Sequence, residues 1–213
     1  MWGILIIIIS IILIVTILFM LFYIWFNRNP NRQIPQGDNI VAPADGKIIK
    51  ILSYDFSKVK QKNKIKIPKG WLGKIYTSTN EISKKGHIIS IFMSPLDVHV
   101  NRIPLEGKVI KEEYSPGKFF KAYDFEKSLE NEKNEIIINN NKIGKYKVIQ
   151  IAGWFARRIN TYINPGNQVK KGQVFGRINF GSQVTMIFPN KIKLTIKEGQ
   201  KVKAGQSILA NLK

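Results

Sequence analysis

The sequence predicts a mainly β domain, with a minor α contribution, carried on one N-terminal transmembrane helix. Residues 1–27 carry no charged side chain and are almost entirely apolar, whereas residues 34–213 alternate apolar and polar positions in short runs broken by Gly, Pro and Asn. A turn pattern of ten residues also occurs twice in the second half. A chain of 213 residues has room for an anchor and one domain, which we expect at 1–27 and 28–213.

The first segment is long enough to cross a bilayer, which takes about 20 apolar residues as a helix. Inside lipid a single segment satisfies its backbone hydrogen bonds only as a helix, despite many β-branched residues. Trp2 and Trp25 lie near its ends, as in interfacial aromatic belts. A cleaved signal peptide fits poorly, because the run has no basic start and no small-x-small cleavage site follows. Arg28 and Arg32 follow directly, so the positive-inside rule predicts a cell-membrane protein with its domain on the cytoplasmic side.

The rest of the chain is expected to form a barrel-sandwich-like β domain. Short apolar-alternating runs bounded by turn residues predict strands. These runs lie at 47–52, 87–93, 108–114, 135–138 and 145–151. The segment 119–129 is compatible with one short helix.

The repeated pattern reads Gly-x-x-Val-Lys-x-Gly-Gln-x-apolar and begins at Gly166 and at Gly199. Glycine at these turns supplies positive φ, and the valine and the last apolar residue are expected to point inward. The pattern resembles the hammerhead turn of lipoyl- and biotinyl-type domains, which marks a fold element rather than an activity. Neither copy has the Met-Lys-Met or Asp-Lys-Ala hairpin that would carry a lipoyl or biotinyl group.

Composition excludes several kinds of site. The chain has no cysteine, and hence no disulfide, thiolate nucleophile or Cys-ligated zinc. His87 and His99 are its two histidines, too few for the ligands of a zinc peptidase, so we expect no metal. Its formal net charge is +20. A basic domain held at a bilayer meets anionic headgroups first, so the expected partner is an anionic phospholipid membrane and not nucleic acid.

Two segments carry candidate acid–base groups. Asp45 lies in an Ala-Pro-Ala-Asp-Gly turn and presents one carboxylate. Residues 94–104 follow an apolar strand and contain His99, on the same face of an extended chain as Asp97 and Asn101. Catalytic groups are often held in loops at the end of a rigid strand. A tight turn and a solvated surface loop are the ordinary alternatives.

A third segment, residues 178–189, contains Gly181 and Ser182 in an otherwise β-like run. Glycine weakens a strand unless the backbone requires it. A strained Gly–Ser peptide bond can undergo an N→O acyl shift, in which the serine hydroxyl attacks the preceding carbonyl carbon. A β-bulge with an ordinary serine is the alternative interpretation.

Together these segments resemble the short, archaetidylserine-type branch of the phosphatidylserine decarboxylase family. The resemblance covers nearly all of the chain after the anchor, and the order and spacing of the motifs agree with it. The matching segments are 42–46, 94–104, 114–120, 150–153 with 156–158, and 176–189.

The resemblance implies a membrane-anchored proenzyme that cleaves itself between Gly181 and Ser182. The larger chain, 1–181, and the smaller chain, 182–213, would stay associated. Ser182 would become a covalent pyruvoyl group, the cofactor, by acyl shift, β-elimination and hydrolysis. That group would form a Schiff base with phosphatidylserine, as an electron sink for its decarboxylation to phosphatidylethanolamine and carbon dioxide.

The resemblance also implies roles for single residues. His99 would protonate the carbanion, since the pKa of histidine lies near the operating pH. Asp45 would orient its imidazole, as in a Ser-His-Asp arrangement. Longer family members carry a second histidine where this chain has Arg102, so His99 would serve self-cleavage, decarboxylation or both.

Four cationic residues are candidates to bind the phosphodiester and the carboxylate of the substrate, because cationic side chains pair with oxyanions. They are Arg102, Lys118, Arg157 and Arg158. A non-catalytic, membrane-anchored barrel-sandwich adaptor is the alternative function. It explains the anchor and the repeat but not the combination of Asp45, His99 and Gly181-Ser182. The sequence leaves the oligomeric state and the ester or ether linkage of the lipid open.

Overall fold

The computed structural model describes residues 2–57, 64–68, 74–79, 81–116, 132–153, 159–179 and 182–213, and of 64–68 and 74–78 the backbone alone. The short helix expected at 119–129 lies outside these residues. The described part is mostly β-strand with one N-terminal helix, which confirms the predicted fold class.

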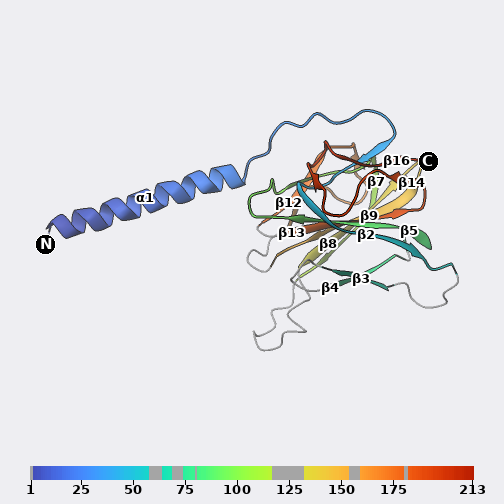
Figure 1. Cartoon of the computed structure of the whole chain (residues 1–213), viewed down its shortest axis with the longest axis horizontal. Coiled ribbons are helices and arrows are strands. Elements are labelled where there is room, and N and C mark those ends of the chain that lie inside the picture. The colour runs from blue at the N-terminus through green and yellow to red at the C-terminus, as the bar shows by residue number, and fades with distance from the viewer. Residues whose placement is uncertain are drawn as a thin grey trace.

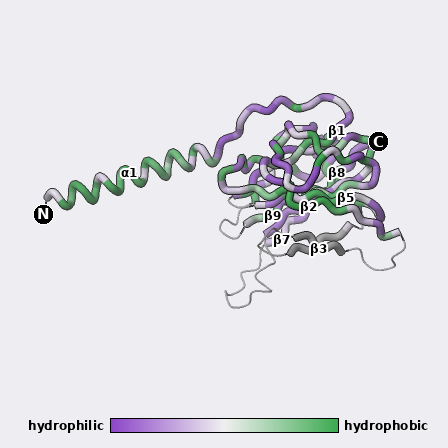
Figure 2. Tube along the Cα trace, viewed as in Figure 1, coloured by the Kyte–Doolittle hydropathy of each residue, from purple (hydrophilic) through white to green (hydrophobic). Residues whose placement is uncertain are grey.

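Helix α1 (Trp2–Phe26) agrees with the predicted anchor and is long and apolar enough to cross a membrane. It extends away from the β domain toward the N-terminus, and the segment after it continues over the domain to the first strand (Figure 1). Hydropathy is high along the whole helix and falls sharply after it (Figure 2). A helix that is apolar on all sides needs an apolar environment around it. Of its described residues, Phe26 alone is buried in the protein.

Eight antiparallel strands form one large sheet, in the order β11-β7-β8-β9-β13-β5-β2-β15. The sheet curls around the main core, as in half of a barrel. Its strands are β2 (Gly46–Asp55), β5 (Lys85–Met93), β7 (Gly107–Ser115), β8 (Lys133–Asn140), β9 (Gly144–Ile151), β11 (Gln168–Val169), β13 (Ser182–Pro189) and β15 (Lys201–Val202).

Three smaller sheets complete the described strands. Their orders are β1-β16-β14, β10-β12-β6 and β3-β4. The strands are β1 (Asn39–Val41), β3 (Lys64–Pro68), β4 (Lys74–Ser78), β6 (Val100–Arg102), β10 (Ile159–Thr161), β12 (Val174–Ile178), β14 (Ile192–Leu194) and β16 (Ile208–Leu212).

Strand β13 lies inside the large sheet and is buried along its whole length. Its alternate residues Val184, Met186 and Phe188 enter the main core, while Ile187 packs in a second cluster on the opposite face. Burying such a side chain contributes roughly 1.5–3 kcal/mol. Gln183 and Thr185 share the opposite face with Ile187 and are also buried, and the side-chain amide of Gln183 donates to the hydroxyl of Thr185 at 2.9 Å.

The two copies of the repeat form the outer ends of the large sheet. Each copy has two glycines with positive φ, at 97° and 78° in the first and at 86° and 74° in the second. Val169 and Val202 are each 3% exposed, and their strands β11 and β15 pair with β7 and β2. The predicted inward valines and glycine turns are therefore confirmed. The last apolar residue of the pattern is buried in the first copy, as Phe175, but Ile208 in the second copy is 38% exposed, so the prediction is wrong there.

The structure extends this repeat to the segments that precede β2 and β7. The N–H of Val41 donates to the carbonyl of Pro104 at 3.0 Å, and the N–H of Arg102 donates to that of Pro43 at 2.9 Å. Strands β2 and β7 both shift register two residues after their first glycine–lysine pair. The β domain therefore contains two similar halves, with Asp45 in one where the other has Glu106.

Candidate active site

Neighbouring strands bring the three candidate segments to one end of the large sheet. Ser182, the first residue of β13, pairs with Met93, the last residue of β5. Lys47 on β2 pairs with Phe92 on β5, so Gly46, the first residue of β2, lies in the same row as Met93 and Ser182. A Cβ on Gly46 would lie 2.1 Å from the carbonyl oxygen of Phe92, so glycine permits this close approach. Asp45 precedes this row and residues 94–104 follow it.

Ser182 is buried, with 1% of its surface exposed. Its hydroxyl lies 3.2 Å from the thioether of Met93, a weak acceptor. The amide of Asn101 approaches the same sulfur at 3.8 Å and accepts a hydrogen bond from Gln150 at 2.8 Å. The hydroxyl is therefore enclosed in protein beside a buried polar network.

His99 is fully buried, and its two ring nitrogens have different environments. Nδ1 lies 2.9 Å from the carbonyl of Asp97, which can only accept, so Nδ1 carries the proton. Nε2 is buried and has no hydrogen-bond partner among the described residues. The ring of Phe26 lies over the imidazole, with centroids 4.4 Å apart. The free lone pair of Nε2 is thus available to accept a proton.

Burial lowers the pKa of His99 to about 4. The hydrogen bond to Asp97 and the charge of that residue oppose the effect, while Arg177 and Arg28 add to it. The sequence led us to expect a pKa near the operating pH, and this was wrong for this form of the protein. The difference arises because Phe26 and the surrounding strands exclude water from the ring. At neutral pH the imidazole is therefore neutral, and its Nε2 can accept a proton.

Asp45 does not contact His99, so the expected orientation of the imidazole by this carboxylate is not found. Nη2 of Arg32 donates to both carboxylate oxygens of Asp45, at 3.0 and 2.8 Å. The backbone N–H of Ala204 donates to Oδ1 at 2.7 Å. The side chains of Arg32 and Asp45 are only 7% and 13% exposed. Arg32 comes from the segment after the anchor, and it neutralises the carboxylate in place of an imidazole.

Arg102 also binds the segment between α1 and the first strand, which contains Arg32. Its guanidinium donates to the side chain of Asn29 at 2.7 Å, to the carbonyl of Pro30 at 3.2 Å and to that of Gly172 at 3.0 Å. Burial lowers the pKa of Arg102, the charge of Arg32 lowers it further, and the charge of Asp45 raises it. In this structure Arg102 fastens the chain after the helix to the β domain.

Comparison with known proteins supplies the family. The family model described as phosphatidylserine decarboxylase matches residues 19–210. The chain belongs to the phosphatidylserine decarboxylase family.

Relatives in this family are similar over most of their length, and each is named phosphatidylserine decarboxylase proenzyme. That of Pelodictyon phaeoclathratiforme is 42% identical over 192 residues, which cover 90% of this chain and 79% of the relative. That of Syntrophus aciditrophicus is 40% identical over 190 residues, covering 89% and 79%. That of Chlorobaculum tepidum is 38% identical over 192 residues, covering 89% and 77%.

Several residues that the resemblance to phosphatidylserine decarboxylases suggested lie outside the described residues. They are Gly181, Lys118, Arg157 and Arg158. Of the predicted site residues, the structure therefore describes Ser182, His99, Asp45 and Arg102.

Two cations near His99 were not assigned to the site from the sequence. Arg28 donates to the carbonyl of Leu96 at 2.8 Å, and its guanidinium lies 3.9 Å above the ring of Trp25. Arg177 on β12 donates to the side chain of Asn27. Their sequence signals were weak, because one arginine marked only the membrane boundary and the other sits inside a strand.

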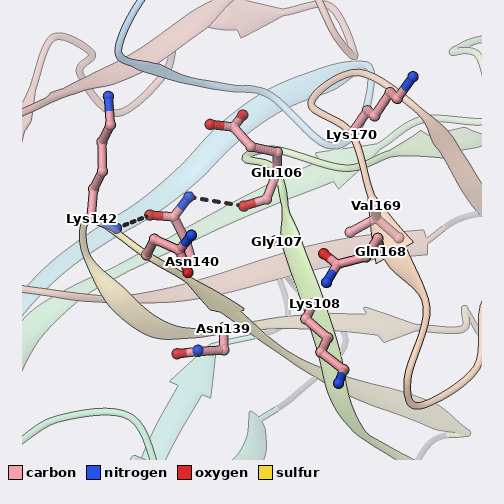
Figure 3. Close-up of a pocket in the computed structure, with 10 residues that line it drawn as sticks. Glu106, Gly107, Lys108, Asn139, Asn140, Lys142, Gln168, Val169 and Lys170 are labelled. Carbon is pink, nitrogen blue, oxygen red and sulfur yellow. Dashed lines mark hydrogen bonds between the residues drawn. The ribbon is translucent and has the colours of Figure 1, made fainter.

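A pocket of about 520 Å³ lies elsewhere, at β7, β8 and β11 (Figure 3). Glu106 in its lining occupies the place that Asp45 has in the other half of the repeat. Asn140 donates to the carbonyl of Glu106 at 2.9 Å and accepts from the N–H of Lys142 at 2.8 Å. The residues that line the pocket include neither Ser182 nor His99, so the pocket is separate from the site that the phosphatidylserine decarboxylase motifs form.

Proposed function

We propose that this protein is a membrane-anchored phosphatidylserine decarboxylase that converts phosphatidylserine to phosphatidylethanolamine and carbon dioxide. The observation that carries the proposal is that, in a member of this family, the segments of Ser182, His99 and Asp45 converge on one end of the large sheet. The names of the relatives support the substrate and the proenzyme form.

In the proposed self-cleavage, Ser182 Oγ attacks the carbonyl carbon of Gly181, and the Gly–Ser C–N bond gives way to an ester. The neutral Nε2 of His99 accepts the hydroxyl proton, a role supported by its unpaired position and by burial that keeps the imidazole neutral at pH 7. Asp45 pairs with Arg32 at 2.8 Å at this end of the sheet. The proton then passes to the freed amine of residue 182. Elimination of the Gly181 carboxylate gives dehydroalanine, and its hydrolysis releases ammonia and leaves residues 1–181 and 182–213.

The residues present fit a pyruvoyl group at position 182. The position is buried, its neighbour Met93 competes weakly for hydrogen bonds, and Nε2 of His99 is an unpaired buried atom. When formed, the pyruvoyl group supplies a ketone that binds the substrate amine and accepts electrons as carbon dioxide leaves. His99, after taking up a proton, would return it to the substrate carbon, and Phe26 would keep water from the ring.

The test of the proposed function is the covalent state of the purified protein. We expect a denaturing gel and intact mass to show two chains, with a keto group on the smaller one that borohydride reduces. Ser182→Ala should remain one chain without decarboxylase activity. Ser90→Ala is the matched control, because Ser90 is an equally buried serine on the neighbouring strand β5, bonded to Thr185. A wild-type protein that stays whole would favour the adaptor instead.

We further propose that α1 anchors the enzyme in the cell membrane with residues 28–213 on the cytoplasmic side. The helix is apolar enough to span, and Arg28 and Arg32 follow it. Because the chain has no cysteine, Lys213→Cys introduces a single thiol at the C-terminus. We expect a membrane-impermeant maleimide to label it only after the cells are permeabilised. Labelling of intact cells would instead show that residues 28–213 lie on the outer side of the membrane.

A further inference from the structure

Two buried nitrogen atoms at the end of α1 have no hydrogen-bond partner among the described residues. They are Nε2 of His99 and Nε of Arg177. Two consecutive residues contact the side chains that carry these atoms. Phe26 stacks on His99, and Asn27 accepts a hydrogen bond from Arg177. Buried polar groups are normally paired, so unpaired atoms at a proposed active site point to a ligand that supplies the missing partner.

The position of Arg177 relative to the membrane suggests which ligand that is. The apolar helix ends at Phe26, so this residue lies at the boundary between hydrocarbon and headgroups if α1 spans the bilayer. Asn27 follows directly and accepts a hydrogen bond from Arg177, so in that orientation the guanidinium would lie at the depth of the lipid phosphates. Arg28, which also lies close enough to affect His99, adds a second positive charge at the same level.

The chemistry of the reaction separates the two anionic groups of a serine phospholipid. A strong ion pair with the carboxylate would stabilise the substrate and be lost as carbon dioxide forms, which would slow the reaction. The phosphodiester keeps its charge from substrate to product, so binding it costs nothing in the transition state. The planar guanidinium fork also matches the geometry of phosphate oxygens.

We propose that Arg177, assisted by Arg28, binds the phosphodiester of the lipid headgroup and so positions the serine part beside His99 and Ser182. This inference rests on the proposed function for its substrate. Its test is a binding measurement on the full chain, which gives a result whether or not the chain cleaves itself.

The test uses two probes that each carry one of the anionic groups and no primary amine. Glycerophosphocholine supplies a phosphodiester, and N-acetylserine supplies a carboxylate. We would titrate each into the full chain in maltoside micelles and measure heat. Arg177→Gln should weaken binding of glycerophosphocholine by at least about tenfold and leave that of N-acetylserine unchanged. Failure of the wild-type chain to bind glycerophosphocholine, or a loss confined to N-acetylserine, would overturn the proposal.

Three further variants separate binding from structure. Lys170→Gln removes an equal charge from an exposed position and should bind as wild type does. Asn27→Ala removes the hydrogen bond between Arg177 and the residue that directly follows α1. This variant should also retain binding, whereas a merely structural role would weaken binding in both Asn27→Ala and Arg177→Gln. Arg177→Lys keeps the charge without the fork and should bind glycerophosphocholine several-fold more weakly. If Arg177→Gln does not fold, an unchanged affinity in Arg177→Lys rejects the proposal.

Discussion

The ring of Phe26 lies over the imidazole of His99, with centroids 4.4 Å apart and an angle of 33° between the rings. Phe26 is the last residue of α1, and His99 belongs to the loop that follows strand β5. The end of α1, the proposed anchor, therefore also covers the candidate active site. Movement of the helix end would change the access of water, and of substrate, to His99.

Replacing Phe26 should expose His99. In Phe26→Ala we expect diethyl pyrocarbonate to modify His99 several-fold faster, because Phe26 and His99 are 3% and 0% exposed in the native structure. Mass spectrometry of the peptides measures the rate, with the half-buried His87 as an internal reference. Phe19→Ala, on the exposed part of the same helix, is the matched control. Equal rates in both variants would contradict a covering role.

Neutralisation of His99 by burial predicts a pH dependence of stability. The pKa of His99 is about 4 in the folded protein and about 6.5 in an unfolded chain. Between these values the unfolded chain binds more protons, so the free energy of unfolding falls as pH drops from about 6.5 to about 4. The loss is at most about 3 kcal/mol.

Urea unfolding of the uncleaved Ser182→Ala chain, measured from about pH 7 to about pH 4, tests this linkage. We expect His99→Gln to flatten the slope and His87→Gln to leave it in place. A slope that persists in His99→Gln would assign the effect to other groups.

His99 should also be required for self-cleavage. Removing a general base typically slows a reaction by about 10²–10⁴-fold, so His99→Ala should leave most of the newly made chain whole. The fraction split with time after synthesis in vitro measures this. His87→Ala should cleave at the wild-type rate, because His87 bonds to Ser53 and Asn190 on another part of the sheet. Normal splitting of His99→Ala would remove its imidazole from the mechanism.

The ion pair between Arg32 and Asp45 should contribute strongly to stability. Removing one partner of a buried pair costs about 3–5 kcal/mol, because it leaves an uncompensated charge. We expect Arg32→Ala to lower the free energy of unfolding by about this amount. Lys142→Ala is the control, since its pair with Asp38 is more than half exposed and should contribute less than about 1 kcal/mol. Similar losses in the two variants would show that Asp45 needs no partner.

The strongest local patterns in the sequence were sufficient to predict the class of the fold. An uncharged apolar run predicts α1 because its composition is decisive over 25 residues. The glycine repeat predicts the turns around Val169 and Val202, since only certain residues accept positive φ. The strands of two or three residues, such as β6 and β10, were not predicted, because they are too short to show a period.

The partners of the site residues required the tertiary structure. Motifs indicated Ser182, His99 and Asp45, and the strand order explains why they meet. The partner of Asp45 is Arg32, which lies in an irregular segment 13 residues earlier, and the cover of His99 is Phe26, which composition assigned to the membrane. Side-chain pairs between irregular segments depend on packing rather than on periodicity, so no sequence pattern predicts them.

The interior position of β13 has a consequence for the lifetime of the mature protein. This strand pairs with β5 on one side and β9 on the other, while β15 and β16, from the same C-terminal stretch, pair with β2 and β1. If the bond before Ser182 breaks as proposed, two separate polypeptides share these sheets, and refolding after denaturation becomes a bimolecular reaction. Each molecule can then reach its native state only once, from the unbroken precursor. Its durability is set by how slowly it unfolds rather than by an equilibrium.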